Sequence, residues 1–203
     1  ELFVHVAHDL AELACDYCNA ITFLHAATLC RGSDVWMLTN PSGSGKTTLA
    51  WQLTQNGYDL IHDDVLPVTR DGQISQMLTP STIKEGSWNI LTNLDLHTDA
   101  FARIGTTARY HPIARTKLPS LFAQRNLVFI NRDPDQPTQM TPLTKLETFQ
   151  RLVSDQCVLR DRSIGTLRQF FTWVSECDGY TLTYSDGSDV ANILQSVTER
   201  CDA

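Results

Sequence analysis

The 203-residue sequence lacks any hydrophobic run long enough to cross a membrane, and it has no internal repeat, low-complexity tract or interdomain linker. Without a linker, residues 1–203 are expected to form one domain, and this length suits a single α/β unit. The sequence also lacks a leader with a charged start and a cleavage site, and it begins at Glu1 without Met. We therefore expect a trimmed or partial sequence of a cytoplasmic protein, with no membrane partner.

Positive charge is scarce as well. The chain has 16 Lys and Arg against 23 Asp and Glu, a formal net charge of −7. This balance argues against non-specific binding to nucleic acid or to an anionic membrane surface, because both depend on excess Lys and Arg. Any basic patch must therefore be local.

Cysteine is present, but its six positions do not form a regular framework. Scattered cysteines of this kind favour reduced thiols over a disulfide framework. Cys15-x-x-Cys18, with His5 and His8 upstream, raises the alternative of a zinc site. However, the apolar spacing over 2–19 predicts an amphipathic helix, which would hold His5 and Cys18 roughly 20 Å apart. We therefore favour ordinary helix thiols.

The most informative stretch is 40–48, which reads Asn-Pro-Ser-Gly-Ser-Gly-Lys-Thr-Thr. An apolar run at 35–39 predicts a strand before it, and apolar spacing over 47–53 predicts a helix after it, ended by Asn56-Gly57. A strand, a glycine-rich turn and a helix N-terminus direct successive backbone N–H groups into one concavity, where they bind phosphate. The sequence therefore predicts a phosphate-binding loop (P-loop).

Each position of this loop has an expected role. Lys46 should reach the outer phosphates, Thr47 should ligate Mg²⁺, and Gly43 and Gly45 should allow close backbone approach. Asn40 replaces the usual first glycine, and it can adopt the positive φ that the turn needs. The expected nucleotide-binding residues are Ser42, Gly43, Ser44, Gly45, Lys46, Thr47 and Thr48.

Apolar periodicity and turn residues predict the remaining elements of an α/β fold, in which helices flank a central sheet. A loop is expected at 79–86, and Ser188 is expected to cap the last helix. The predicted strands are 21–29, 59–64, a hairpin over 65–78, 126–131 and 180–184, and the predicted helices are 2–19, part of 87–105, 144–153, 164–174 and 188–198.

Two carboxylates, Asp63 and Asp64, end the strand that follows the P-loop helix. Ligands collect at the carboxyl ends of strands in doubly wound sheets, so these acids should lie beside the phosphates. The strand at 21–29 should place His25 on a strand next to the one that leads into the P-loop. From the residues alone, Asp63 and Asp64 could instead be a pair that only holds Mg²⁺, and His25 could be a packed strand residue.

The spacing of these residues resembles the C-terminal domain of the HPr kinase/phosphorylase family. Lys46 lies 21 residues after His25, and Asp63 lies 17 residues after Lys46, followed by Asp64-Val65. The resemblance covers 22–68 well and continues by general layout to about residue 198. It implies a P-loop kinase fold with a mixed central sheet flanked by helices. It also implies that Asp63 is the general base on the acceptor, that Asp64 belongs to the Mg²⁺ and water network, and that His25 lies near the γ-phosphate. Asp63, His25 and Lys46 would form the catalytic set.

One segment departs from that family. After the acidic pair, the family carries a glycine-containing, arginine-bearing signature, whereas this chain reads Ile-Lys-Glu-Gly-Ser-Trp over 83–88. The departure implies an acceptor other than HPr itself. It leaves Glu85 as a candidate metal ligand and Lys84 as a candidate phosphate contact.

Basic residues gather in one region, 102–117, which contains Arg103, Arg109, Arg115 and Lys117. Gly105 interrupts it, and a mobile loop that closes over phosphate or an acidic acceptor is one interpretation. An ordinary solvated surface loop is the other.

Two functions fit these observations. The first is an ATP-dependent, Mg²⁺-dependent kinase acting on a Ser or Thr hydroxyl of a peptide or protein, or on a small-molecule hydroxyl. The second is a nucleotide-binding regulatory or scaffold protein with little or no ATPase activity. An ABC-type ATPase is disfavoured because no Leu-Ser-Gly-Gly-Gln run occurs. The sequence leaves the acceptor, the phosphoryl donor and homo-oligomerisation open.

Overall fold

A computed structural model describes Leu13, Tyr17 and residues 19–74, 79–92, 102–104, 108–114, 116, 122–159 and 161–201. Most of the predicted helix at 2–19 lies outside these residues; Leu13 and Tyr17 are helical and exposed. Within the described part of the chain, no helix is long and apolar enough to span a membrane.

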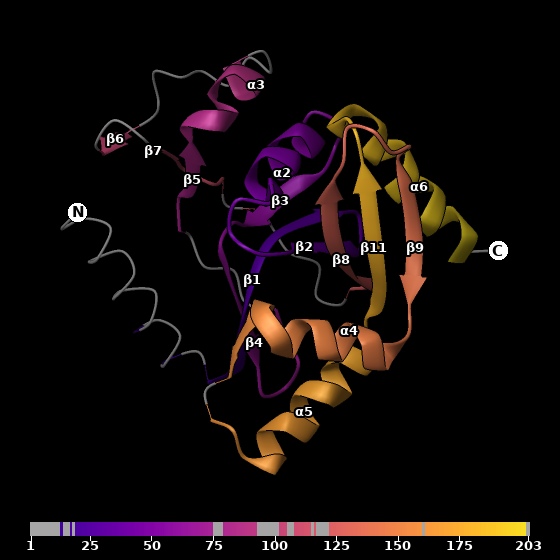
Figure 1. Cartoon of the computed structure of the whole chain (residues 1–203). Helices are drawn as coiled ribbons and strands as arrows, with labels where there is room; N and C mark the ends of the chain where they lie inside the picture. Colours follow the sequence, from indigo (N-terminus) through magenta and orange to yellow (C-terminus); the bar gives the residue numbers. More distant parts are fainter. Residues whose placement is uncertain are drawn as a thin grey trace.

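The core of the fold is an eight-stranded mixed sheet (Figure 1). Its order is β10-β1-β2-β8-β11-β9, and β3 and β4 also pair with β1. β2, β8 and β11 run parallel, whereas β1 and β9 are antiparallel to their neighbours. The predicted mixed sheet is therefore confirmed. The strands are β1 (Ala20–Arg31), β2 (Asp34–Thr39), β3 (Asp59–His62), β4 (Val65–Thr69), β8 (Gln124–Arg132), β9 (Gln139–Leu143), β10 (Cys157–Leu159) and β11 (Asp178–Tyr184).

Strand β1 is long enough to join two parts of this sheet. Its second half pairs with β2 on one side and β3 on the other, and its first half pairs with β4 and β10. Because both β2 and β3 are antiparallel to β1, they point in the same direction. The carboxyl ends of β2 and β3, where the P-loop and the acidic pair begin, therefore lie at the same edge of the sheet.

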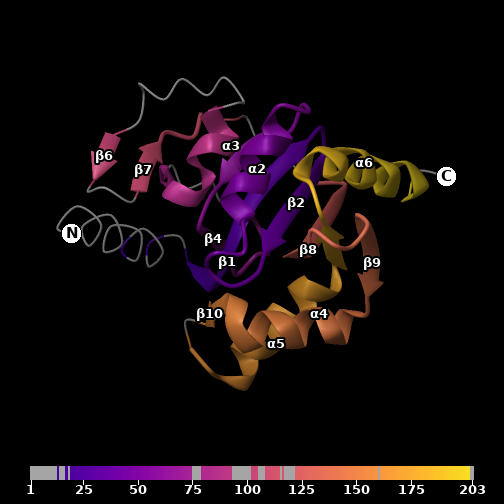
Figure 2. The same cartoon turned by 45° about the horizontal axis from the view of Figure 1, so that its top comes forward.

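Helices cover both faces of the sheet. Successive side chains of β2 point to opposite faces and pack against different helices. Trp36 and Leu38 pack with α2 (Lys46–Thr54) and α6 (Val190–Cys201) on one face. Val35 and Met37 point to the other face, into the cluster that contains Phe170 of α5 (Ile164–Ser175). Figure 2 shows α4 (Lys145–Arg151) beside α5 on that second face. A π-helical turn (Leu152–Gln156) extends α4.

A second, three-stranded sheet lies beside α2 in Figures 1 and 2, with the order β5-β7-β6. Its strands are β5 (Ser81–Lys84), β6 (Ala102–Ile104) and β7 (Ala108–His111), and β5 continues through a 3₁₀ turn, η1 (Glu85–Ser87), into α3 (Trp88–Thr92). The prediction of a loop at 79–86 is therefore wrong. The basic region 102–117 is also not a loop throughout, because β6 and β7 pair within it.

Other parts of the fold also differ from the prediction. β9 contains Pro142, and β10 has only three residues, so neither matches the pattern of a buried strand; both lie at the ends of the sheet order. Ser188 does not cap α6. It lies inside a 3₁₀ turn, η4 (Gly187–Asp189), whose N-cap is Asp186. Of the predicted hairpin over 65–78, the structure shows β4 and an antiparallel bridge from Val68 to Ile74, and 75–78 lie outside the described residues.

Close packing of α4 on β11 gives a test of the fold. Gly179 of β11 lies directly beneath Thr148 of α4, and a Cβ at position 179 would collide with the buried Thr148 hydroxyl. We predict that Gly179→Ala lowers the free energy of unfolding by about 1–3 kcal/mol, because the helix must shift outward. Urea denaturation measures this change.

The control is Gly165→Ala at the start of α5, where the nearest atom to an added Cβ is 3.7 Å away. It should change stability by no more than about 1 kcal/mol. Adding Thr148→Ala to Gly179→Ala should recover part of the loss, and strict additivity of the two changes would contradict the proposed collision.

Candidate functional site

The loop between β2 and α2 has the glycine-dependent backbone that a phosphate-binding loop requires. Gly43 and Gly45 have φ values of 87° and 92°, a region that favours glycine, and a Cβ on Gly45 would lie 3.3 Å from the Tyr184 hydroxyl. Gly45 is the N-cap of α2, no side chain caps it, and no acidic residue lies in the first turn. The positive end of the helix therefore faces the loop without a capping side chain, and its own first turn supplies no acidic residue to neutralise it.

Asn40 supports this loop in an unexpected way. Among the described non-glycine residues, only Asn19 and Asp64 have positive φ, so the predicted use of a positive φ at Asn40 is wrong. Instead, the Asn40 amide donates a hydrogen bond to the carbonyl of Ile130 on β8. The side chain thus ties the start of the loop to the neighbouring parallel strand.

Lys46 folds back over the loop. Its Nζ donates to the carbonyl oxygens of Asn40, at 2.6 Å, and Pro41, at 3.1 Å, and the residue is only 6% exposed. Burial lowers the pKa of Lys46 to about 8, an effect that Asp63 and Asp64 oppose. A bound polyphosphate would favour the charged ammonium.

Asp63 is held in the interior by two hydroxyl groups. Thr47 Oγ1 lies 3.0 Å from both carboxylate oxygens, and Ser81 Oγ donates to Oδ2 at 2.6 Å. The residue is 2% exposed, and burial raises the pKa of its carboxyl group, although both hydrogen bonds counteract the shift. Thr47, the predicted metal ligand, and Asp63, the predicted general base, are therefore in direct contact.

Asp64 has a different environment from Asp63. Its Oδ1 lies 3.1 Å from His25 Nε2, and its side chain is 65% exposed, compared with 33% for His25. The hydrogen bond from His25 is the main cause that lowers the pKa of Asp64. The backbone φ of Asp64 is 89°, which is uncommon for a non-glycine residue. This conformation directs the adjacent carboxylates of Asp63 and Asp64 to two different environments.

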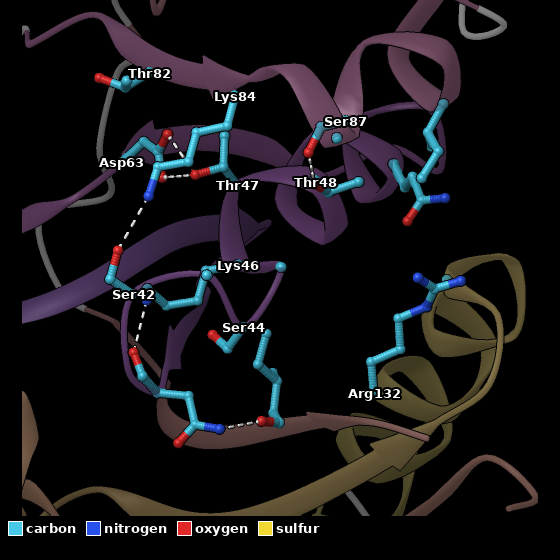
Figure 3. A pocket seen from close by; sticks show the side chains of 18 of the residues that line it. Ser42, Ser44, Lys46, Thr47, Thr48, Asp63, Thr82, Lys84, Ser87 and Arg132 are labelled. Atoms are coloured by element: carbon cyan, nitrogen blue, oxygen red, sulfur yellow. Dashed lines mark hydrogen bonds between the residues drawn. The ribbon is translucent and has the colours of Figure 1, made fainter. Parts of the chain in front are cut away.

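These groups line one cavity of about 1050 Å³ (Figure 3). Lys84 reaches from β5 and donates to Ser42 Oγ at 3.1 Å, and the Ser87 and Thr48 hydroxyls are 2.5 Å apart. Across the cavity from Ser44, Figure 3 shows Arg132 at the end of β8. The small sheet, the P-loop and the ends of β8 and β11 thus surround one space.

The structure brings most of the predicted site residues together. Glu85 is exposed and is not among the cavity-lining residues, and Arg109 places its guanidinium 4.0 Å from the Trp88 ring. The side chain of Arg103, and the whole of Arg115 and Lys117, lie outside the described residues. The predicted residues that line the cavity are His25, Ser42, Gly43, Ser44, Gly45, Lys46, Thr47, Thr48, Asp63, Asp64 and Lys84.

Sequence reasoning missed several lining residues. Ligands collect at the carboxyl ends of parallel strands, and the prediction used this only for β3. The carboxyl ends of β8 and β11 also line the cavity, through Arg132 and the segment 184–187. Ser81 had no comparable signal because its partner, Asp63, is 18 residues away in sequence.

The donors present fit a magnesium–polyphosphate ligand. Mg²⁺ in such sites is bound by one or two carboxylates, phosphate oxygens and waters, and Thr47 and Asp63 supply suitable oxygens. The Ser44 hydroxyl is buried without a hydrogen-bond partner in a loop that lines the cavity. Over the described residues, no group of three or more His, Cys, Asp or Glu side chains could hold a metal alone.

The cysteines add no second site where they are described. Cys30, Cys157 and Cys177 are free thiols, and burial raises the pKa of Cys30 to about 11 and that of Cys177 to about 12. Such thiols are poor nucleophiles and poor metal ligands at neutral pH. Cys15 and Cys18, with the neighbouring histidines His5 and His8, lie outside the described residues.

No family model and no curated protein matches this sequence. Among solved structures, the chain shows a distant resemblance to the HPr(Ser) kinase/phosphatase from Coxiella burnetii, with a TM-score of 0.40 and 12% sequence identity. The match covers 89% of this chain and 90% of that chain. Similarity at this level carries no argument about function, which therefore depends on the geometry of the site.

The lowered pKa of Lys46 predicts a pH-dependent affinity for ATP. The phosphates are fully ionised above about pH 7, so the protonation state of Lys46 controls the attraction. Without metal, affinity should be highest below pH 8, fall as the pH rises through about 8, and then decrease by about tenfold per pH unit. Calorimetry in EDTA across pH 7–10 measures this dependence.

Two variants serve as controls. Lys46→Arg keeps its charge throughout this range, so its affinity should be nearly independent of pH, and Lys46→Ala should bind weakly at every pH. Wild-type affinity in Lys46→Ala, or an unchanged pH dependence in Lys46→Arg, would contradict the role of Lys46.

Proposed function

We propose that this protein is a Mg²⁺-dependent P-loop phosphotransferase that binds ATP and transfers its γ-phosphoryl group to a hydroxyl. The acceptor is a Ser or Thr of a peptide or protein other than HPr, or a small-molecule hydroxyl. The observation that carries the proposal is the contact between Thr47 Oγ1 and the Asp63 carboxylate at 3.0 Å, directly after the glycine-rich loop. A threonine and a carboxylate in this position would hold Mg²⁺ against the phosphates.

The loop and Lys46 account for binding. Backbone N–H groups at the start of α2 and the Lys46 ammonium would neutralise the charge on the β- and γ-phosphates, which is the main requirement of phosphoryl transfer. Bound Mg²⁺ would supply further neutralisation. None of these groups needs to react covalently.

The contacts favour a division of roles that reverses the expectation from sequence. Both oxygens of Asp63 contact hydroxyl groups in the interior, which suits a metal ligand. Asp64 is largely exposed in the cavity and is oriented by His25, which suits a proton acceptor. Its lowered pKa keeps it ionised at neutral pH.

In the proposed step, the acceptor oxygen attacks the γ-phosphorus while the bond to the β–γ bridging oxygen breaks. ADP leaves with the electron pair of that bond, and the proton of the acceptor hydroxyl passes to the Asp64 carboxylate. His25 stabilises the carboxylate before transfer. The cavity of about 1050 Å³ is at the upper end of small-ligand pockets, so it has room for a nucleotide and an acceptor group.

Paired amide substitutions test these roles. Asp64→Asn should reduce transfer from γ-labelled ATP to Ser- and Thr-containing peptides and to polyols by about 10²- to 10⁴-fold, with nucleotide affinity preserved. Asp63→Asn should instead raise the Mg²⁺ concentration required. If Asp63→Asn lowers transfer at saturating Mg²⁺ by about 10²- to 10⁴-fold without raising the Mg²⁺ concentration required, Asp63 is the base, as the family resemblance implied.

The same assay separates the two functions. A regulatory or scaffold protein would bind ATP·Mg²⁺ with wild-type dependence on Lys46 but would transfer no label to any acceptor and release little phosphate. A phosphotransferase should give a phosphate ester whose formation requires Lys46 and Mg²⁺.

A further inference from the structure

The buried hydrogen bonds at Asp63 continue beyond the site, and the role inferred for them rests on the proposed function. The indole Nε1 of Trp51, on α2, donates to Ser81 Oγ at 3.0 Å, and Ser81 Oγ donates to Asp63 Oδ2 at 2.6 Å. The chain of contacts therefore joins three parts of the fold: the P-loop helix, the first strand of the small sheet, and the segment that follows β3.

The direction of these hydrogen bonds is determined by chemistry. An indole N–H can only donate, so the Ser81 oxygen must accept from Trp51. The single Ser81 proton is then directed to Asp63. Asp63 Oδ2 accepts it, which restrains the rotation of a carboxylate whose two oxygens both lie 3.0 Å from Thr47 Oγ1.

Burial makes this arrangement hard to replace. Ser81 is 0% exposed, Asp63 is 2% exposed and Trp51 is 7% exposed, so bulk water has little access to either hydrogen bond. In such an environment an unpaired polar group is costly, and linked hydrogen bonds strengthen one another. Neither Ser81 nor Trp51 lines the cavity, so their contribution to the site must pass through Asp63.

The segment that carries Ser81 contacts the site at two other points. Lys84 bonds Ser42, and Ser87 bonds Thr48, so the stretch from β5 into η1 contacts the acid, the loop and the helix in turn. The small sheet is therefore attached to the nucleotide site by polar groups, and Ser81 is the innermost of them.

We propose that Ser81 is a positioning residue that orients the Asp63 carboxylate for the divalent cation and connects the cation to the indole of Trp51. When the cation binds the Asp63 carboxylate, the hydrogen bond that Ser81 donates to Asp63 must change. The hydrogen bond from Trp51 N–H to Ser81 must then change as well. A purely structural hydrogen bond would stabilise the fold but would leave metal affinity and this response unaffected.

Indole N–H resonances in ¹H–¹⁵N NMR spectra provide the test, with Trp51→Phe used to assign the Trp51 signal. The protein is first saturated with the β,γ-imido analogue of ATP in EDTA, and Mg²⁺ is then added. In the wild type, the Trp51 signal should move with Mg²⁺. The Trp173 signal should stay fixed, because this indole donates to Gly72 O in the other core cluster.

In Ser81→Ala, the Mg²⁺ concentration for half-saturation should rise by about 10- to 100-fold, the usual effect of losing a group that orients a metal ligand. The Trp51 signal should no longer follow Mg²⁺. Ser81→Thr retains the hydroxyl and should restore both properties. Competition with Mn²⁺, followed by electron paramagnetic resonance of the free ion, measures affinity independently of activity.

Each outcome has one interpretation. A wild type that binds neither analogue nor metal would overturn the proposed function itself. If the wild type binds both and Ser81→Ala binds Mg²⁺ with unchanged affinity, the positioning role is wrong. If Ser81→Ala fails to fold, judged by the Trp173 signal, Trp51→Phe decides by Mn²⁺ affinity: several-fold weaker binding supports the proposal, and unchanged binding overturns it.

Discussion

The contact between Thr47 and Asp63 is the constraint on which the rest of the site depends. It joins the first turn of α2 to the segment after β3, and it forms only because β2 and β3 point the same way on either side of β1. Because β1 lies antiparallel between them, β2 and β3 run in the same direction, and the glycine-rich loop and the acidic pair lie at one edge of the sheet. The long, buried β1 is therefore as important to the site as the loop itself.

Burial then gives neighbouring charges different properties. It raises the pKa of Asp63 and lowers that of Lys46, so both charged forms are destabilised in the protein alone. Asp64, one residue later, is exposed and hydrogen-bonded to His25, and its pKa is lowered. A metal–polyphosphate ligand would supply the missing counter-charges for Lys46 and Asp63 together, which accounts for a site that keeps two unlike charges in the interior.

The sequence predicted those parts of the site whose signal is local. The strand, glycine turn and helix around Lys46 are adjacent in the chain, and Asp63 ends an apolar run. Strand β5 was missed because its only apolar residue is Ile83 and its pairing partner β7 lies far along the chain. Ser81 was missed for the same reason, since its role depends on contacts that no local pattern encodes.

A crystal structure with Mg²⁺ and the β,γ-imido analogue of ATP would decide whether Thr47 and Asp63 form the metal site. We expect the phosphates on the amides of 43–48, with Mg²⁺ at about 2.1 Å from Thr47 Oγ1 and with Asp63 bound to it directly or through a water. Phosphates bound elsewhere, or a metal without Thr47 and Asp63 in its surroundings, would contradict this assignment.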